Sequence, residues 1–313
     1  MCHLPNLRKS PTQNHYMNRW LILQRDYGQL GNRLHTHANA IAWCLEMKIN
    51  LINLSFFEYA EGFSLFHGKP IHSLTLCESI FSFFLRISNQ RNLLDRICRS
   101  EKWLKHTGKI LKVIQKDDHQ TIGEKELGEL FEDEPKKRFT LVRAWDLNCP
   151  DLITKHQTEI RKIFTPKAEF TESAKFEVAK LREKYDCVVG VHARRGDYKE
   201  YLGGIHFHSW DSYRNWIGQT KALIEKNGCK NVGFVMCSDD DAPPLAFADL
   251  PLHFMEKKSV MSDLHALSLC DYNIGPPSSF GTWLSWYGRV PRLHLVKELK
   301  IRSLDQFTIC SGC

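Results

Sequence analysis

Long apolar runs are missing from this chain of 313 residues. A membrane-spanning helix needs roughly 18 or more consecutive apolar residues, whereas the most apolar region, Ile71 to Ile87, is interrupted by Glu78 and Arg86. The amino-terminal segment is polar and contains Pro5 and Pro11, so it lacks the roughly 7–15 apolar residues of a secretory signal. We therefore expect a cytoplasmic protein with no membrane span.

Two common phosphate-binding patterns are missing as well. The sequence contains no G-x-x-x-x-G-K-[ST] loop, and Gly28–Arg33 lacks the third glycine that would complete G-x-G-x-x-G. A phosphate-binding site in this chain must therefore be built from other groups.

Basic residues are only slightly in excess of acidic ones. The chain has 43 Lys and Arg against 36 Asp and Glu, a formal net charge of +7, and the basic residues are scattered. Because nucleic-acid-binding proteins gather basic residues into a stripe or tail, this distribution argues against a nucleic-acid partner. An anionic small ligand, such as a phosphorylated metabolite, remains compatible with it.

Complete sets of metal ligands are scarce. The 11 cysteines are an odd number in apolar contexts such as Trp43-Cys44-Leu45, which predicts reduced, buried thiols. Cys310–Cys313 is a C-x-x-C pair without a second pair, which favours a frayed end over a zinc or redox site. The paired histidines at 35 and 37, and at 206 and 208, have no neighbouring carboxylate or cysteine to complete a set.

The patterned segments predict an α/β protein. A strand at Arg19–Gln24, a helical pattern from Leu34 to Leu45 and a strand at Ile49–Leu54 form a βαβ unit, and hence a parallel sheet. Weaker patterns follow, in chain order: helical at Cys77–Arg99, a strand at Lys109–Ile114, a loop or short helix at Gly123–Arg138, a strand at Phe139–Ala144, and helices over Asp151–Tyr185 broken at Pro166.

The carboxyl-terminal half alternates more regularly. Strands and helices are predicted in turn at Cys187–His192, Ser212–Lys226, Val232–Cys237, Met261–Cys270, Tyr272–Gly275 and Ser279–Gly288. This alternation is typical of a doubly wound α/β domain. We expect two domains, residues 1–170 and residues 171–313.

Ligands in such sheets bind beyond the carboxyl ends of the strands, and three strand ends carry polar groups. The first, His192–Tyr198, contains Arg194 and Arg195, whose planar guanidinium groups can hold phosphate oxygens at two points. A turn held together by salt bridges is the alternative. The second, Pro276–Gly281, leads into a helix, so Ser278, Ser279 and Phe280 either face an anion or serve as an ordinary cap.

Three aspartates, Asp239 to Asp241, form the third strand end. They could bind a Mg²⁺ or Mn²⁺ ion that bridges diphosphate oxygens. In the alternative that we favour, Asp239 and Asp240 accept hydrogen bonds from ribose or a base, or cap a turn.

These segments resemble those of a known enzyme family. His192–Tyr198 is similar to the H-x-R-R-G-D-Y signature of α-1,2-fucosyltransferases, which are related to α-1,6- and protein O-fucosyltransferases. Gly28–Arg33 resembles their G-x-L-G-N-Q turn, and Asp263–Asp271 followed by Ser278–Phe280 resembles their third motif. The order agrees from residue 19 to residue 296, with residues 56–180 outside the resemblance.

The resemblance implies a GT-B-like architecture of two Rossmann-like, doubly wound domains facing across a cleft. The implied activity is inverting transfer of L-fucose from GDP-fucose to a sugar hydroxyl of a glycan acceptor, with an α-1,2 linkage and without a metal or other cofactor. Residues 1–170 would face the acceptor, and residues 171–313 would bind the nucleotide sugar.

The resemblance also implies roles for single residues. Arg194 would bind the diphosphate, with Ser278, Ser279 and Phe280 closing on it, while His192 and Asp263 would contact guanine. Asn32 would lie at the cleft floor beside Arg33, which stands where the family has glutamine, and Arg195, Asp239 and Asp240 are further substrate-binding candidates.

The general base is open between Asp197 and Glu200, and Asp197 could instead pair with Arg195. Two further functions remain open: a metal-dependent transferase of another nucleotide sugar, and a non-catalytic nucleotide- or glycan-binding protein on the same fold.

Overall fold

The computed structural model describes residues 19–24, 28–53, 56, 59, 62–63, 111–116, 120–134, 136–256 and 259–311. The helix expected at Cys77–Arg99, the polar amino-terminal segment and the last cysteine of the C-x-x-C pair lie outside these residues.

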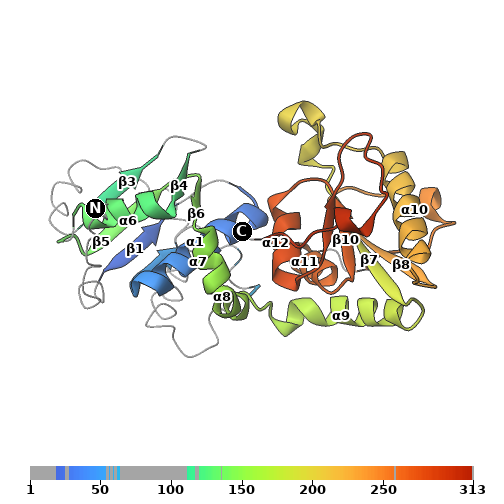
Figure 1. Cartoon of the computed structure of the whole chain (residues 1–313), viewed down its shortest axis with the longest axis horizontal. Helices are drawn as coiled ribbons and strands as arrows, with labels where there is room; N and C mark the ends of the chain where they lie inside the picture. The colour runs from blue at the N-terminus through green and yellow to red at the C-terminus, as the bar shows by residue number, and fades with distance from the viewer. Residues whose placement is uncertain are drawn as a thin grey trace, which may run out of the picture. The chain divides into compact units, whose positions relative to one another are not determined.

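Two compact units divide the chain (Figure 1). The first consists of Met1–Tyr27, His37–Phe57 and Phe66–His156, and the second of Gly28–Thr36, Glu58–Leu65 and Gln157–Cys313. The second unit therefore includes the Gly28–Arg33 turn that the sequence analysis singled out.

The first unit is built on a parallel sheet of four strands in the order β2-β1-β5-β3. Its elements are β1 (Trp20–Leu23), the part of α1 (Leu30–Met47) from His37 onward, β2 (Asn50–Asn53), β3 (Leu111–Gln115), β4 (Thr121–Gly123), α6 (Glu124–Glu132), β5 (Phe139–Arg143), β6 (Asp146–Asn148) and α7 (Pro150–Lys155). The βαβ opening is confirmed, since β1 and β2 pair in parallel around α1. The small sheet of β4 and β6 was not predicted, because three residues are too few for a periodic signal.

The second unit holds a parallel sheet of five strands in the order β11-β10-β7-β8-β9. Its elements are α8 (Gln157–Ile163), α9 (Ala168–Arg182), β7 (Cys187–Ala193), α10 (Trp210–Lys226), β8 (Val232–Ser238), β9 (Leu252–Phe254), α11 (Val260–Ser268), β10 (Tyr272–Gly275), α12 (Ser279–Gly288) and β11 (Arg292–His294). The strand that comes first in this unit, β7, lies in the middle of its sheet; β8 and β9 extend the sheet on one side, and β10 and β11 on the other. The predicted doubly wound sheet is confirmed, and its order reverses between β7 and β10.

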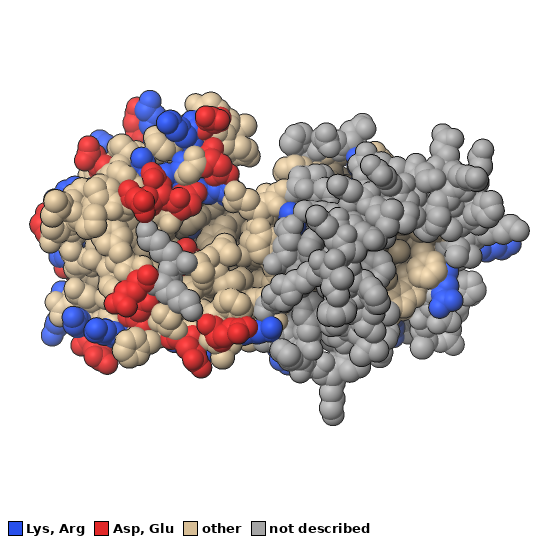
Figure 2. Space-filling model, turned by 180° about the vertical axis from the view of Figure 1, so that it is seen from behind, with Lys and Arg blue, Asp and Glu red and all other residues tan. Residues whose placement is uncertain are grey.

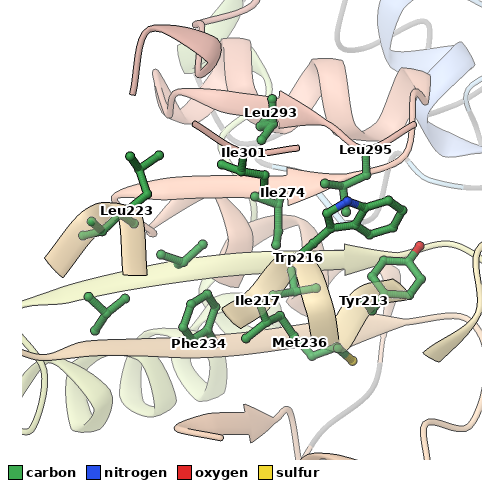
Figure 3. Close-up of a cluster of buried hydrophobic side chains, with 14 of the residues drawn as sticks. Tyr213, Trp216, Ile217, Leu223, Phe234, Met236, Ile274, Leu293, Leu295 and Ile301 are labelled. Carbon is green, nitrogen blue, oxygen red and sulfur yellow. The ribbon is translucent and has the colours of Figure 1, made fainter. Parts of the chain in front are cut away.

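Helices cover both faces of this sheet because its central strands are apolar on both sides. Every residue of β7 is buried. On one face, Tyr213, Trp216 and Ile217 of α10 pack over Phe234 and other apolar side chains of the strands (Figure 3). On the other face, α11 contacts β7 and β8, and Gly190 admits the Leu267 side chain.

The described cysteines carry no disulfide, which agrees with the expected reduced state. Among the described residues, no helix has the length and apolar character needed to cross a bilayer. On the face shown in Figure 2, Lys and Arg side chains lie among Asp and Glu side chains, without a continuous basic surface on its described part.

Candidate functional site

The candidate site lies in the second unit, where β7 and β10 end. These neighbouring strands are the point at which the strand order reverses, and ligands of open α/β sheets bind at such points. Arg194 follows β7 and Pro276 follows β10. The Tyr198 hydroxyl donates to the Pro277 carbonyl at 2.6 Å, so the two turns are joined directly.

Arg194 pairs with Asp197 through one edge of its guanidinium group. Nε donates to Oδ1 at 2.9 Å and Nη2 to Oδ2 at 2.6 Å, and Nη2 also reaches Gln29 Oε1 at 3.3 Å. The group lies 4.4 Å from the ring centroid of Tyr198. None of these bonds uses Nη1. Arg194 is thus held in place with a donor left for a ligand.

Asp197 therefore pairs with Arg194, and the alternative that it pairs with Arg195 is wrong. Asp197 begins the short helix Asp197–Lys199, and its carboxylate forms an ion pair with Arg194, three residues earlier in the chain. The hydrogen bonds from Arg194 lower the pKa of the Asp197 carboxyl.

Arg195 is held by a different set of groups. Nε donates to Asp240 Oδ2 at 2.9 Å and Nη1 donates to the His208 carbonyl. The guanidinium carbon lies 4.4 Å from the ring centroid of Phe207 and 4.3 Å from that of Trp210. These contacts engage the charge of Arg195 with groups of the protein itself.

Asp239 clamps the turn after β7. Its Oδ1 accepts from the backbone N–H of Arg195 at 2.7 Å and from that of Gly196 at 3.1 Å. The hydrogen bond from Arg195 lowers the pKa of Asp240. Within the described part of the chain, no three His, Cys, Asp or Glu side chains gather as a metal site would require.

The turn before α12 presents a helix amino terminus at the site. Ser278 caps the helix by accepting from Gly281 N at 2.9 Å, while Ser279 is half-buried and Phe280 is buried. His35 Nε2 donates to the Ser279 carbonyl at 2.7 Å. A Cβ at Gly31 would overlap the backbone of Phe280. The Gly28–Arg33 turn therefore meets the Ser278–Phe280 turn, a contact that the sequence analysis did not predict.

His192 lies beneath these two turns. It is buried, with its ring centroid 5.0 Å from that of Phe280. Burial, together with the charges of Arg292 and Arg194, holds the pKa of His192 well below its ordinary value. The ring is therefore neutral at pH 7.

Asp263 approaches the same strand ends from α11. It lies in the first turn of that helix. Burial, together with the nearby charge of Asp263, raises the pKa of the Cys237 thiol. Cys237 is the β8 partner of His192 in the parallel register. Asp263 is thus near Cys237, which neighbours His192 in the sheet. The two residues expected to contact guanine therefore lie in the same region of the strand ends.

Three further candidates lie around this centre. Asn32 is half-buried in the first turn of α1, and Arg33 is buried, donating to the Gly28 carbonyl at 2.9 Å with its guanidinium carbon 5.4 Å from the Tyr59 ring centroid. Glu200 is exposed, just after the helix that carries Asp197.

Sequence reasoning missed Arg292. This residue opens β11, has no exposed surface, and donates from Nη2 to the Pro276 carbonyl at 3.0 Å. An arginine inside the apolar run from Val290 to Leu295 was the available signal.

Comparisons with known proteins show what the chain and its fold are similar to. No protein-family profile matches the sequence. A stretch of 139 residues, 42% of this chain, is 27% identical to an α-1,2-colitosyltransferase of Escherichia coli and covers 46% of that protein. The match thus spans about half the length of the curated relative.

Two solved structures share the fold. A variant of Arabidopsis thaliana FUT1 in complex with GDP has a TM-score of 0.52 and 12% identity, covering 91% of this chain and 74% of that chain. POFUT1 in complex with GDP-fucose has a TM-score of 0.52 and 12% identity, covering 87% of this chain and 94% of that chain. The expected likeness to the GT-B-like α/β fold of fucosyltransferases is confirmed.

Proposed function

We propose that this protein is an inverting fucosyltransferase that moves L-fucose from GDP-fucose to a sugar hydroxyl. One observation carries the proposal. The hydrogen bonds of Arg194 use Nε and Nη2, so Nη1 is left to bind a ligand at the strand-order reversal, beside the amino terminus of α12. A fixed arginine and a helix amino terminus together are suited to a diphosphate.

The donor is assigned by chemistry and by similarity. The carboxylate of Asp263 can accept from the N1–H and 2-amino groups of guanine, which adenine and uracil do not present together. The FUT1 and POFUT1 structures that share the fold contain GDP and GDP-fucose. These points favour GDP-fucose over other nucleotide sugars.

The chemistry of the transfer follows from these groups. The acceptor hydroxyl attacks the anomeric carbon from the side opposite GDP and loses its proton to a base, while the bond to the β-phosphate breaks. Negative charge grows on that phosphate, where Arg194 can stabilise it. We propose Glu200 as the base, because Asp197 is engaged by Arg194 and its pKa is lowered.

A metal ion is not required in this scheme. Asp239 already accepts from two backbone N–H groups and Asp240 from Arg195, so neither carboxylate offers all its oxygen atoms to a cation. Arg194 supplies positive charge where a cation would otherwise stand.

The α-1,2 linkage and a glycan acceptor are the finer part of the proposal. They rest on the H-x-R-R-G-D-Y resemblance and on the name of the E. coli relative. The E. coli relative is a colitosyltransferase by name, so a colitosyl donor is tested alongside GDP-fucose.

The decisive experiment is calorimetric titration with GDP, GDP-fucose, ADP and UDP-glucose, followed by transfer assays from GDP-fucose and from a colitosyl donor to a glycan panel with EDTA present. We expect GDP and GDP-fucose to bind most tightly and transfer to continue in EDTA. Equal affinity for all nucleotides would overturn the donor assignment. Activity lost in EDTA and restored by Mn²⁺ would favour the metal-dependent alternative, and binding without turnover would favour a non-catalytic protein.

A further inference from the structure

Arg292 is a buried cation that forms no ion pair with a carboxylate among the described residues. Its side chain has no exposed surface, and Nε and Nη1 have no hydrogen-bond partner among the described residues. Within that part of the chain, the one side-chain hydrogen bond of Arg292 runs from Nη2 to the Pro276 carbonyl. Burial lowers its pKa to about 10, which leaves it protonated at neutral pH.

The guanidinium group lies directly behind the candidate anion site. A Cβ at Gly281, in the first turn of α12, would overlap it, and a Cβ at Gly275 would lie 2.8 Å from Nη2. Both glycines flank the Ser278–Phe280 turn. The absence of side chains at these positions lets the charge approach the backbone of the turn.

This placement is electrostatically unfavourable in the protein alone. A helix amino terminus carries a partial positive charge, so the cation behind it adds repulsion to the cost of burial. The neighbouring imidazole of His192 is neutral, and the charge of Arg292 contributes to lowering the pKa of His192. No described acidic side chain forms an ion pair with Arg292.

We propose that Arg292 is an internal positive charge of the diphosphate site, and that the bound diphosphate at the Ser278–Phe280 turn is its missing counter-charge. This inference rests on the proposed function. Arg292 is a positioning residue: it holds the turn through Pro276 and strengthens the positive field at the turn without touching the ligand.

Two variants test the charge of Arg292. Arg292→Gln removes the charge and leaves a shorter polar side chain with an N–H donor, whereas Arg292→Lys keeps a cationic group and loses the planar one. Arg302→Gln removes a charge from an exposed position of the same unit and serves as the control.

The measurements are the affinities for GDP, guanosine and inorganic diphosphate, and the melting temperature without ligand. For Arg292→Gln we expect roughly tenfold weaker binding of GDP and diphosphate, which corresponds to about 1.4 kcal/mol, with guanosine unchanged. Its melting temperature should be equal to or above that of the wild type. Arg292→Lys should retain most of the affinity, and Arg302→Gln should behave as the wild type.

Other outcomes overturn the inference. An Arg292→Gln variant that fails to fold, or that loses guanosine binding as much as GDP binding, would make Arg292 a structural residue. Unchanged affinity for both GDP and diphosphate would remove its electrostatic role. If the wild type binds diphosphate but does not prefer GDP, the proposed donor fails while the diphosphate comparison still decides the role of Arg292.

Discussion

Arg194 and Asp197 face each other through two hydrogen bonds, from Nε to Oδ1 at 2.9 Å and from Nη2 to Oδ2 at 2.6 Å. The pair fixes the orientation of the guanidinium group before any ligand arrives. Such preorganisation spares the protein a reorientation when charge develops on a leaving phosphate.

Arg194→Lys should lower kcat roughly 100-fold or more with the fold intact, because lysine keeps the charge but cannot make the two-point contact. Steady-state kinetics and circular dichroism measure both effects. Arg214→Lys changes another arginine that pairs with an aspartate, Asp249, at an exposed position, and should leave kcat unchanged. A nearly normal rate for Arg194→Lys would exclude the proposed role.

Arg195→Lys should lower the melting temperature more than it weakens GDP binding. The guanidinium group lies close to the rings of Phe207 and Trp210 and pairs with Asp240, and an ammonium group cannot make all of these contacts. Thermal denaturation and calorimetry on one preparation give the comparison. An inactive but fully stable Arg195→Lys variant would instead place Arg195 at the substrate.

Glu200→Gln should abolish most turnover while leaving GDP affinity unchanged, since a base acts on the acceptor and not on the nucleotide. Asp197→Asn should weaken GDP binding as well, because it releases Arg194. The two variants are compared by their kcat and by GDP titration. If Asp197→Asn loses turnover and Glu200→Gln does not, Asp197 is the base and Glu200 is not.

Asp263→Ala should weaken GDP binding and narrow its advantage over ADP, because the carboxylate is the proposed acceptor for the guanine edge. Asp249→Ala, at an exposed position of the same unit, is the matched control. Parallel titrations with GDP and ADP measure the ratio. If the ratio of GDP affinity to ADP affinity is unchanged in Asp263→Ala, a residue other than Asp263 recognises the guanine base.

His265 should make stability fall as the pH falls below its ordinary pKa. Burial lowers the pKa of His265 from 6.5 to about 4, so between these values the unfolded chain binds more protons than the folded one. Each such group contributes about 1.4 kcal/mol per pH unit. His265→Phe should reduce this slope in urea titrations between pH 6.5 and pH 4. An unchanged slope would contradict a neutral His265.

Much of the second unit was predictable because its signals are local. Buried parallel strands are apolar along their whole length, as in Cys187–Ala193 and Val232–Ser238, and helices follow them at regular intervals. The strand-end rule then places Arg194 and Ser278 at one edge of the sheet. The short strands β9 and β11 were not predicted, because three residues are too few to show a periodic pattern.

The sequence does not show which charged side chains pair with one another. The sequence by itself determined the alternation of strands and helices and the residue types at the strand ends, since apolar periodicity is set by near neighbours in the chain. Only the tertiary structure decided that Asp197 pairs with Arg194, that Asp240 pairs with Arg195, and that Arg292 lies behind the Ser278 turn. These contacts depend on side-chain direction and on packing between segments far apart in the chain, which residue spacing does not encode.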